Sequence, residues 1–113
     1  MTMEIAGRRI GPDQQPYIIA EMSGNHNQSL SRALEIVEAA AKAGAHAIKL
    51  QTYTADSMTL PHNDGEFFIS DEVSLWKGES LHALYQKAHT PWEWHEPIME
   101  RATKLGLGCF STP

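Results

Sequence analysis

The sequence is poor in cysteine, has fewer basic than acidic residues, and contains no long hydrophobic run. Its single cysteine, Cys109, excludes an internal disulfide bond and fits a reducing compartment. The net charge of -5 argues against non-specific binding to nucleic acid, which requires a basic face. No apolar segment approaches the length needed to cross a membrane, and no apolar core of a signal peptide follows the first basic residues. We therefore expect a cytoplasmic protein that binds neither nucleic acid nor membranes.

Two apolar segments organise the 113 residues, whose composition is that of one globular unit. Tyr17–Ala20 is a continuous apolar run, which predicts a strand buried on both faces, and Glu21 follows it directly. Ala45–Gln51 is a second run, and its end carries Lys49 and Gln51 in place of aliphatic residues. Both segments are predicted to be strands that end in polar side chains.

The segment between these strands has the spacing of an amphipathic helix. Apolar residues recur at helical intervals over residues 30–43, with Ser29 suited to cap the amino end and Gly44 to terminate the helix. Strand, helix and strand with short joints require a parallel pair and a right-handed crossover. Before this unit, residues 3–10 are expected to form two short strands around Gly7.

A long mixed segment, residues 52–78, follows the second strand. Loops of this length are usually functional or contain small elements, and we expect its apolar residues to fold back over the sheet edge. Ser80 is then predicted to cap a short helix over residues 81–88.

A second long helix is predicted to begin with a capping box. Thr90 is placed at the N-cap, Pro91 at the first helical position and Glu93 at the third, and the helix stops at Gly106. Residues 107–110 then form a third strand, and residues 111–113 leave its end.

The alternation of strands and helices predicts an α/β fold, either a TIM barrel or a doubly wound sheet. The first connecting loop lacks G-x-G-x-x-G, which disfavours a dinucleotide-binding sheet. A barrel of eight units needs roughly 250 residues. We therefore interpret residues 1–113 as the first three βα units of a (β/α)8 TIM barrel, with an insertion after the second strand, and expect the chain to be a fragment.

The carboxyl edge of the predicted sheet holds the leading candidate residues, because parallel α/β folds place their chemistry there. Glu21 is suited to orient water, accept a proton or stabilise a developing positive charge, or simply to form a salt bridge. Lys49 interrupts an apolar run, so it requires an anion, either a phosphate or carboxylate ligand or Glu21 itself. Gln51 is two residues away and shares its face.

Three further residues are candidates for contacts with a ligand. Asn25 and His26 follow Glu21 within one loop, and His26 is a possible acid, base or hydrogen-bond donor. Thr112, beside Ser111 at the third strand end, could donate to a phosphate or serve only in a turn. The other histidines show no metal-ligand spacing and are interpreted as surface or structural residues: His46, His62, His82, His89 and His95.

Five segments of the sequence resemble the amino-terminal part of the sialic acid synthase family. The family pattern is carried by I-A-E-x-x-x-N-H-x-x-S and K-x-Q-T, and S-L-W-K-G and H-T-P-W-E-W-H point to its pseudaminic acid synthase branch. The segments cover nearly the whole chain after residue 16: IIAEMSGNHNQSL (18–30), EAAAKAGAHAIKLQTYT (38–54), FFISD…SLWKGESL (67–81), AHTPWEWHEPI (88–98) and CFSTP (109–113).

This resemblance implies a TIM barrel followed by a small antifreeze-like domain that reaches across a homodimer. The implied reaction condenses phosphoenolpyruvate with an N-acetylated amino sugar and water, and it releases phosphate by C–O cleavage. For the pseudaminate branch the sugar is 2,4-diacetamido-2,4,6-trideoxy-altropyranose, and the product is pseudaminic acid, which is used on bacterial surface glycans and flagellin.

The resemblance also implies roles for the candidate residues. Glu21 would stand near C2 of the enol, while Lys49 and Gln51 would hold the carboxylate and phosphate of phosphoenolpyruvate. Thr112 would add a hydroxyl donor, and Asn25 and His26 would lie near the substrate. The family's divalent metal, Mn or Mg, is bound by histidines on later strands, so its ligands are not in this chain and we expect the chain alone to be inactive.

Two alternatives stay open. The full-length protein could be an N-acetylneuraminate or legionaminate synthase of the same family, or another barrel that condenses phosphoenolpyruvate. The chain could instead be a non-catalytic module that associates through its open sheet edge.

Overall fold

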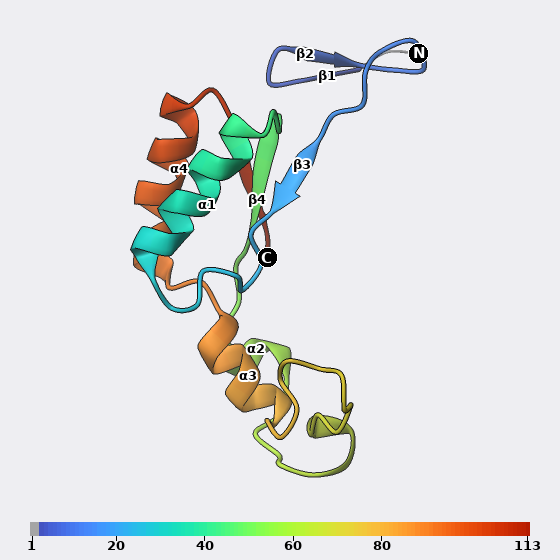
Figure 1. Ribbon diagram of the computed structural model, residues 1–113, viewed down its shortest axis with the longest axis vertical. Coiled ribbons are helices and arrows are strands. Elements are labelled where there is room, and N and C mark those ends of the chain that lie inside the picture. Colours follow the sequence, from blue (N-terminus) through green and yellow to red (C-terminus); the bar gives the residue numbers. More distant parts are fainter. Residues whose placement is uncertain (1–2) are drawn as a thin grey trace.

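A three-stranded parallel sheet forms the centre of the computed structural model, which describes residues 3–113 (Figure 1). The strand order is β3-β4-β5, and Glu21 is paired in register with Lys49, and Gln51 with Thr112. The predicted parallel arrangement is therefore confirmed. The strands are β3 (Ile19–Glu21), β4 (Ala47–Gln51) and β5 (Gly108–Thr112).

Two helices, α1 (Leu30–Lys42) and α4 (His95–Lys104), cover one face of this sheet (Figure 1). The Ser29 side chain accepts a hydrogen bond from the Arg32 amide, so the predicted cap of α1 is confirmed. Gly44 follows α1 with φ of +93°, a conformation that suits glycine at a helix end. The core between helices and sheet consists of Met22, Ala33, Val37, Ala40, Ile48, Leu50, Ile98, Ala102 and Leu107.

The predicted capping box at Thr90 is wrong. Residues 92–94 form a short 3-10 helix, η2 (Trp92–Trp94), and neither η2 nor α4 has a side-chain cap. The Thr90 side chain is buried at 2% exposure and lies against the His26 ring. The Thr90 hydroxyl, which the sequence pattern predicted to cap the helix, therefore bonds to the distant His26 ring instead.

The third strand is longer than predicted at its carboxyl end. Ser111 and Thr112 belong to β5 and do not leave it, because the Thr52 amide donates to the Thr112 carbonyl at 2.8 Å and extends the ladder with β4. The pairing with β4 consequently fixes the backbone positions of Ser111 and Thr112, and with them the positions of their hydroxyl side chains.

The sheet face opposite the helices is open in the described residues. Ile19 is 43% exposed and Phe110 is 41% exposed, and Ile18 at the edge is 54% exposed. The predicted burial of the first strand on both faces is therefore wrong in residues 3–113, where helices cover only one face. Glu21 and Lys49 lie on the open face.

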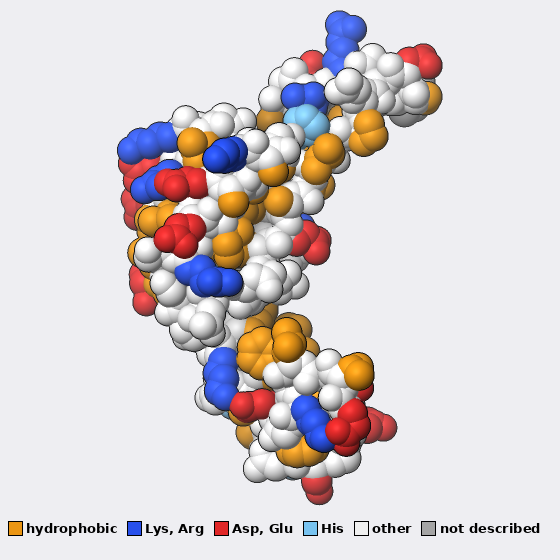
Figure 2. Space-filling model, viewed as in Figure 1, with side chains coloured by type: hydrophobic (Ala, Val, Ile, Leu, Met, Phe, Trp, Pro, Cys, Tyr) orange, Lys and Arg blue, Asp and Glu red, His pale blue; other side chains and the backbone are white. Residues whose placement is uncertain are grey.

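Acidic and basic side chains are interspersed over the helical layer (Figure 2). One ion pair there, between Arg101 and Glu38, joins α4 to α1. The view in Figure 2 shows no extended surface of one charge sign. Among residues 3–113, no helix is long and apolar enough to cross a membrane.

A hairpin and a lobe extend from the two ends of the sheet (Figure 1). The hairpin pairs β1 (Met3–Ile5) with β2 (Arg8–Ile10) around Ala6 and Gly7, both of which have positive φ, as a tight hairpin turn requires. The two predicted short strands are thus confirmed.

The lobe lies beyond the carboxyl ends of the strands and contains the long segment (Figure 1). Helix α2 (Ala55–Met58) and the 3-10 helix η1 (Gly65–Phe67) precede α3 (Leu81–Ala88), which Ser80 caps as predicted. The segment packs on α3, with Tyr53 stacked edge to face on Tyr85, and leaves Val73 88% and Leu75 96% exposed. The prediction that its apolar residues fold over the sheet edge is wrong.

Candidate functional site

An ion pair between neighbouring strands forms the centre of the candidate site. The Lys49 ammonium on β4 donates to a Glu21 carboxylate oxygen on β3 at 2.8 Å, as their register in the parallel sheet allows. The Lys49 side chain is 26% exposed and the Glu21 side chain 59% exposed. Both therefore face the open side of the sheet, and the predicted convergence of the two charges is confirmed.

This pair is partly solvated, so its own contribution to folding is small, about 0–1 kcal/mol. A salt bridge between Lys49 and Glu21 was the alternative interpretation of both residues in the sequence, and the structure contains it. This salt bridge uses only part of the hydrogen-bonding capacity of Lys49, because the ammonium has three N–H donors and Glu21 accepts a hydrogen bond from one of them. Within residues 3–113, no other hydrogen bond or ion pair of the ammonium is found, which leaves two donors for a second anion.

Gln51 and Thr112 lie one step further toward the carboxyl ends of β4 and β5. They are paired in register, and both are exposed. Gln51 is two residues from Lys49 on β4 and so shares its face. The Thr112 hydroxyl approaches the Leu50 carbonyl at 3.5 Å, the limit of a hydrogen bond. The predicted amide and hydroxyl donors thus join the ammonium at one edge.

A chain of hydrogen bonds supports these strand ends. The Thr52 hydroxyl lies 2.8 Å from His95 Nε2 and 2.5 Å from the Ser111 hydroxyl. His95 Nδ1 lies 3.1 Å from the Trp92 carbonyl, which can only accept, so Nδ1 carries the hydrogen and Nε2 of the neutral ring accepts from Thr52. His95 thereby connects α4 to the ends of β4 and β5, in agreement with its interpretation as a structural residue.

The loop between β3 and α1 engages Asn25 in local hydrogen bonds. The Asn25 side-chain amide donates to the Met22 carbonyl at 2.9 Å, and the backbone carbonyl of Asn25 accepts from Arg32 Nε at 2.9 Å. Ser23 and Asn27 in the same loop have positive φ, which costs conformational energy for residues other than glycine. Asn25 therefore stabilises a strained loop in this structure, and its predicted substrate contact stays a prediction.

His26 is placed in the core and not at the sheet edge. The side chain has 0% exposure and packs edge to face on Trp94 with ring centroids 5.1 Å apart. Its Nδ1 accepts from the Gln28 amide at 3.2 Å, so Nε2 carries the hydrogen and donates to the Thr90 hydroxyl at 3.3 Å. The structure therefore does not bring His26 to the candidate site, because Nδ1 bonds within the loop and Nε2 joins the loop to the segment before α4.

We predict that protonation of His26 destabilises the fold. Burial, and secondarily the nearby His89, lower the pKa of His26 from its ordinary value near 6.5. The unfolded chain therefore binds this proton at a higher pH than the folded chain, and stability falls as pH drops below about 6.5, until the depressed folded-state pKa is reached. Thermal unfolding of the wild type and His26→Gln between pH 8 and pH 5 should show a steeper decline for the wild type.

If the thermal stability of the wild type and of His26→Gln declined equally with falling pH, His26 would not be the group whose protonation destabilises the fold. His89→Gln is the matched control, because His89 lies in the same region and is only partly buried. It is expected to retain most of the acid decline of the wild type, because burial is the larger cause of the lowered pKa of His26.

Residues 3–113 do not supply a metal site. No group of three His, Cys, Asp or Glu side chains in this range is arranged to hold a metal ion. The Cys109 thiol is partly buried against the core, and that burial raises its pKa, which suits an inert core thiol and not a ligand or nucleophile.

The contact between Thr52 and His95 was not predicted from the sequence, although His95 was interpreted as a surface or structural residue. Thr52 belongs to the K-x-Q-T motif, so its position directly after the strand was visible. The partner His95 lies 43 residues away in the chain, and only the fold brings its ring to Thr52.

The site therefore combines one cation, two neutral donors and one carboxylate on the open face of a parallel sheet. A cation beside amide and hydroxyl donors suits an anionic ligand with several oxygens. A carboxylate next to such a ligand can stabilise positive charge or orient water.

Comparison with known proteins identifies relatives of this chain. A pseudaminic acid synthase from Campylobacter jejuni is 50% identical over 101 residues, which are 89% of this chain and 29% of that protein. A pseudaminic acid synthase from Helicobacter pylori is 50% identical over 100 residues, or 88% of this chain and 29% of that protein. The chain thus spans less than a third of the length of these curated relatives.

The fold is shared with a solved sialic acid synthetase. The structure of N-acetylneuraminic acid synthetase from Leptospira borgpetersenii, in complex with citrate, matches 100% of this chain and 34% of that chain, with a TM-score of 0.78 and 25% identity. In addition, the model of the NeuB family matches residues 36–113. The chain therefore belongs to the NeuB family and is related to the sialic acid synthases.

Proposed function

We propose that this chain is the amino-terminal part of a nonulosonic acid synthase that condenses phosphoenolpyruvate with an N-acetylated amino sugar and water and releases phosphate. The observation that carries the proposal is the Lys49–Glu21 pair at the carboxyl edge of the sheet. The identity to two pseudaminic acid synthases supports pseudaminic acid as the product. The three strands would then be the first of a (β/α)8 barrel.

In this proposal Lys49 binds the doubly charged phosphoenolpyruvate through the two N–H donors that Glu21 does not use. Gln51 and Thr112 donate to oxygens of the same ligand from the neighbouring positions. Because the residues that carry these donors lie on paired strands, the sheet sets their positions. Little reorganisation is therefore needed when the ligand binds.

Glu21 would act at C2 of the enol. Attack by C3 on the sugar aldehyde leaves positive charge at C2, which a nearby carboxylate stabilises, and the same carboxylate can then accept a proton from the water that adds there. Loss of phosphate from the resulting tetrahedral carbon completes the reaction.

The remaining parts of the active site would come from outside this chain. The divalent metal that the family resemblance implies finds no site in residues 3–113, so we derive no step through it. We propose that its ligands, like the homodimer and the antifreeze-like domain, belong to the full-length protein in the cytoplasm, and that the chain alone is inactive.

The test is phosphate release from phosphoenolpyruvate by the full-length protein. We expect release with 2,4-diacetamido-2,4,6-trideoxy-altropyranose and at most weak release with the sugar precursors of N-acetylneuraminate and legionaminate. Preference for one of the other two sugars would assign the protein to another branch, and absence of release with all three would overturn the proposed reaction.

The open sheet supports a second candidate, a non-catalytic module that pairs with another chain. The exposed Ile19 and Phe110 on the uncovered face are the observation that favours it. Size-exclusion chromatography of the 113-residue chain distinguishes the two, since a stable monomer with cooperative unfolding would contradict association through the open edge.

A further inference from the structure

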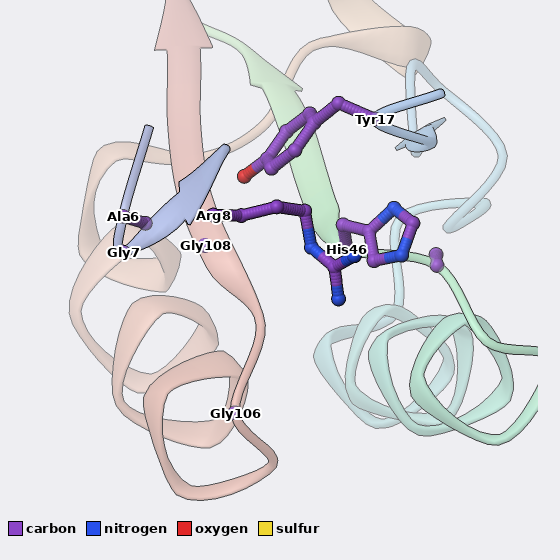
Figure 3. Close-up of a pocket in the computed structure, with 8 residues that line it drawn as sticks. Ala6, Gly7, Arg8, Tyr17, His46, Gly106 and Gly108 are labelled. Atoms are coloured by element: carbon purple, nitrogen blue, oxygen red, sulfur yellow. The ribbon is translucent and has the colours of Figure 1, made fainter. Parts of the chain in front are cut away.

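A cavity lies at the amino ends of the strands, opposite to the Lys49–Glu21 pair. It has a volume of about 440 Å³, is partly open to solvent, and lies between the β1–β2 hairpin and the segments that enter the sheet (Figure 3). This volume falls in the range of small-molecule sites. Its lining residues are Ala6, Gly7, Arg8, Tyr17, Ala45, His46, Gly106 and Gly108.

The His46 ring presents a hydrogen-bond donor in this region. Its Nδ1 accepts from the Ile18 amide at 2.8 Å, so in the neutral ring Nε2 carries the hydrogen. The Tyr17 ring packs on His46 with centroids 5.5 Å apart, which holds the two side chains together. Figure 3 shows both rings at the cavity, with the Tyr17 hydroxyl pointing toward the strand that carries Gly108.

Arg8 supplies a positive charge to the same cavity. Its side chain extends from β2 toward His46 (Figure 3). Within residues 3–113, Arg8 forms no ion pair, and none of the cavity's lining residues is acidic. The neighbouring Arg9 is not among the lining residues and is paired in register with Glu4 on the hairpin.

Glycine keeps the cavity open at its base. A Cβ atom at Gly108 would lie 3.0 Å from the Tyr17 hydroxyl oxygen, so a side chain there would displace the hydroxyl. Cβ atoms at Gly7 and Gly106 would meet no other atom within 4 Å, which leaves these walls accessible to a ligand.

We propose that this cavity binds a phosphate group, held by the Arg8 guanidinium, the Tyr17 hydroxyl and His46 Nε2–H. An arginine fork matches phosphate oxygens, and three donors that come from different directions suit a tetrahedral anion better than a planar carboxylate. The proposal does not depend on the proposed reaction, because no residue of the Lys49–Glu21 site takes part.

The test is isothermal titration calorimetry of the full-length protein with inorganic phosphate. The measurement uses a Lys49→Met background, which removes the anion-binding lysine at the other end of the sheet. We expect saturable phosphate binding that Arg8→Gln weakens by at least about tenfold and Tyr17→Phe by roughly fivefold. Arg9→Gln, the matched control on the same strand, should bind as the background protein does.

Three results would overturn the proposal: no saturable binding in the background protein, equal losses for Arg8→Gln and Arg9→Gln, or binding of succinate in preference to phosphate. Thermal melting of each variant checks that folding is retained. Tyr17→Phe removes a single hydroxyl and provides a second measure that does not alter the charge of the hairpin.

Discussion

In the full-length protein, Lys49→Met is expected to lower kcat/KM for phosphoenolpyruvate by roughly 10²- to 10³-fold. The substitution removes the only cation among the four residues of the site while keeping an unbranched side chain of similar length. The loss should be seen mainly as a raised KM, because the ammonium contacts the ligand before and during the reaction. Steady-state measurement of phosphate release at varied phosphoenolpyruvate concentration gives both constants.

Lys104→Met is the matched control for this substitution. Lys104 forms an ion pair with Glu100 at 3.6 Å on the surface of α4, so it loses the same kind of contact far from the sheet edge. Its kinetics should match those of the wild type, and both variants should melt close to the wild-type temperature because exposed ion pairs contribute little. A Lys49→Met protein with wild-type kcat/KM would show that the lysine serves only as a salt bridge.

Glu21→Gln is expected to lower kcat by roughly 10²- to 10⁴-fold, the range for loss of a general acid or base. The KM for phosphoenolpyruvate should stay constant or fall, since the amide keeps an acceptor for Lys49 and removes a negative charge beside an anionic substrate. This separation of kcat from KM distinguishes a role in the chemical step from a role in holding Lys49. Single-turnover measurement of phosphate release is the appropriate assay.

Glu38→Gln controls for the removal of a carboxylate from an ion pair, because Glu38 pairs with Arg101 on the helical layer. It should leave kcat unchanged. If Glu21→Gln retained kcat within about threefold of the wild type, the proposed role at C2 would be excluded, since the expected contribution of such a group is far larger.

The sequence predicted the carboxyl edge of the sheet because local patterns determine it. Apolar runs located β3 and β4, and the polar residues at their ends therefore had to meet once the strands were parallel, as the 2.8 Å contact between Lys49 and Glu21 shows. Ser29 and Ser80 could be assigned as caps for the same reason, since each contacts an amide three residues away.

The errors arose where a distant contact overrides a local pattern. Thr90 has the sequence context of a helix cap, but the buried His26 ring, 64 residues away, takes its hydroxyl. His26 likewise follows Glu21 closely in the chain, but the loop turns its ring into the core, a placement that no local pattern indicates. The lobe formed by residues 52–88 packs on itself, and its apolar content could not indicate which surface it would contact.

The measurement that tests the account most directly is a crystal structure of the full-length protein with phosphoenolpyruvate bound. We predict that Lys49 Nζ lies about 2.7–2.9 Å from an oxygen of the ligand, with Glu21 facing C2 from the neighbouring strand. Phosphoenolpyruvate bound at a different place, with Lys49 still paired only to Glu21, would contradict the proposed function of this sheet edge.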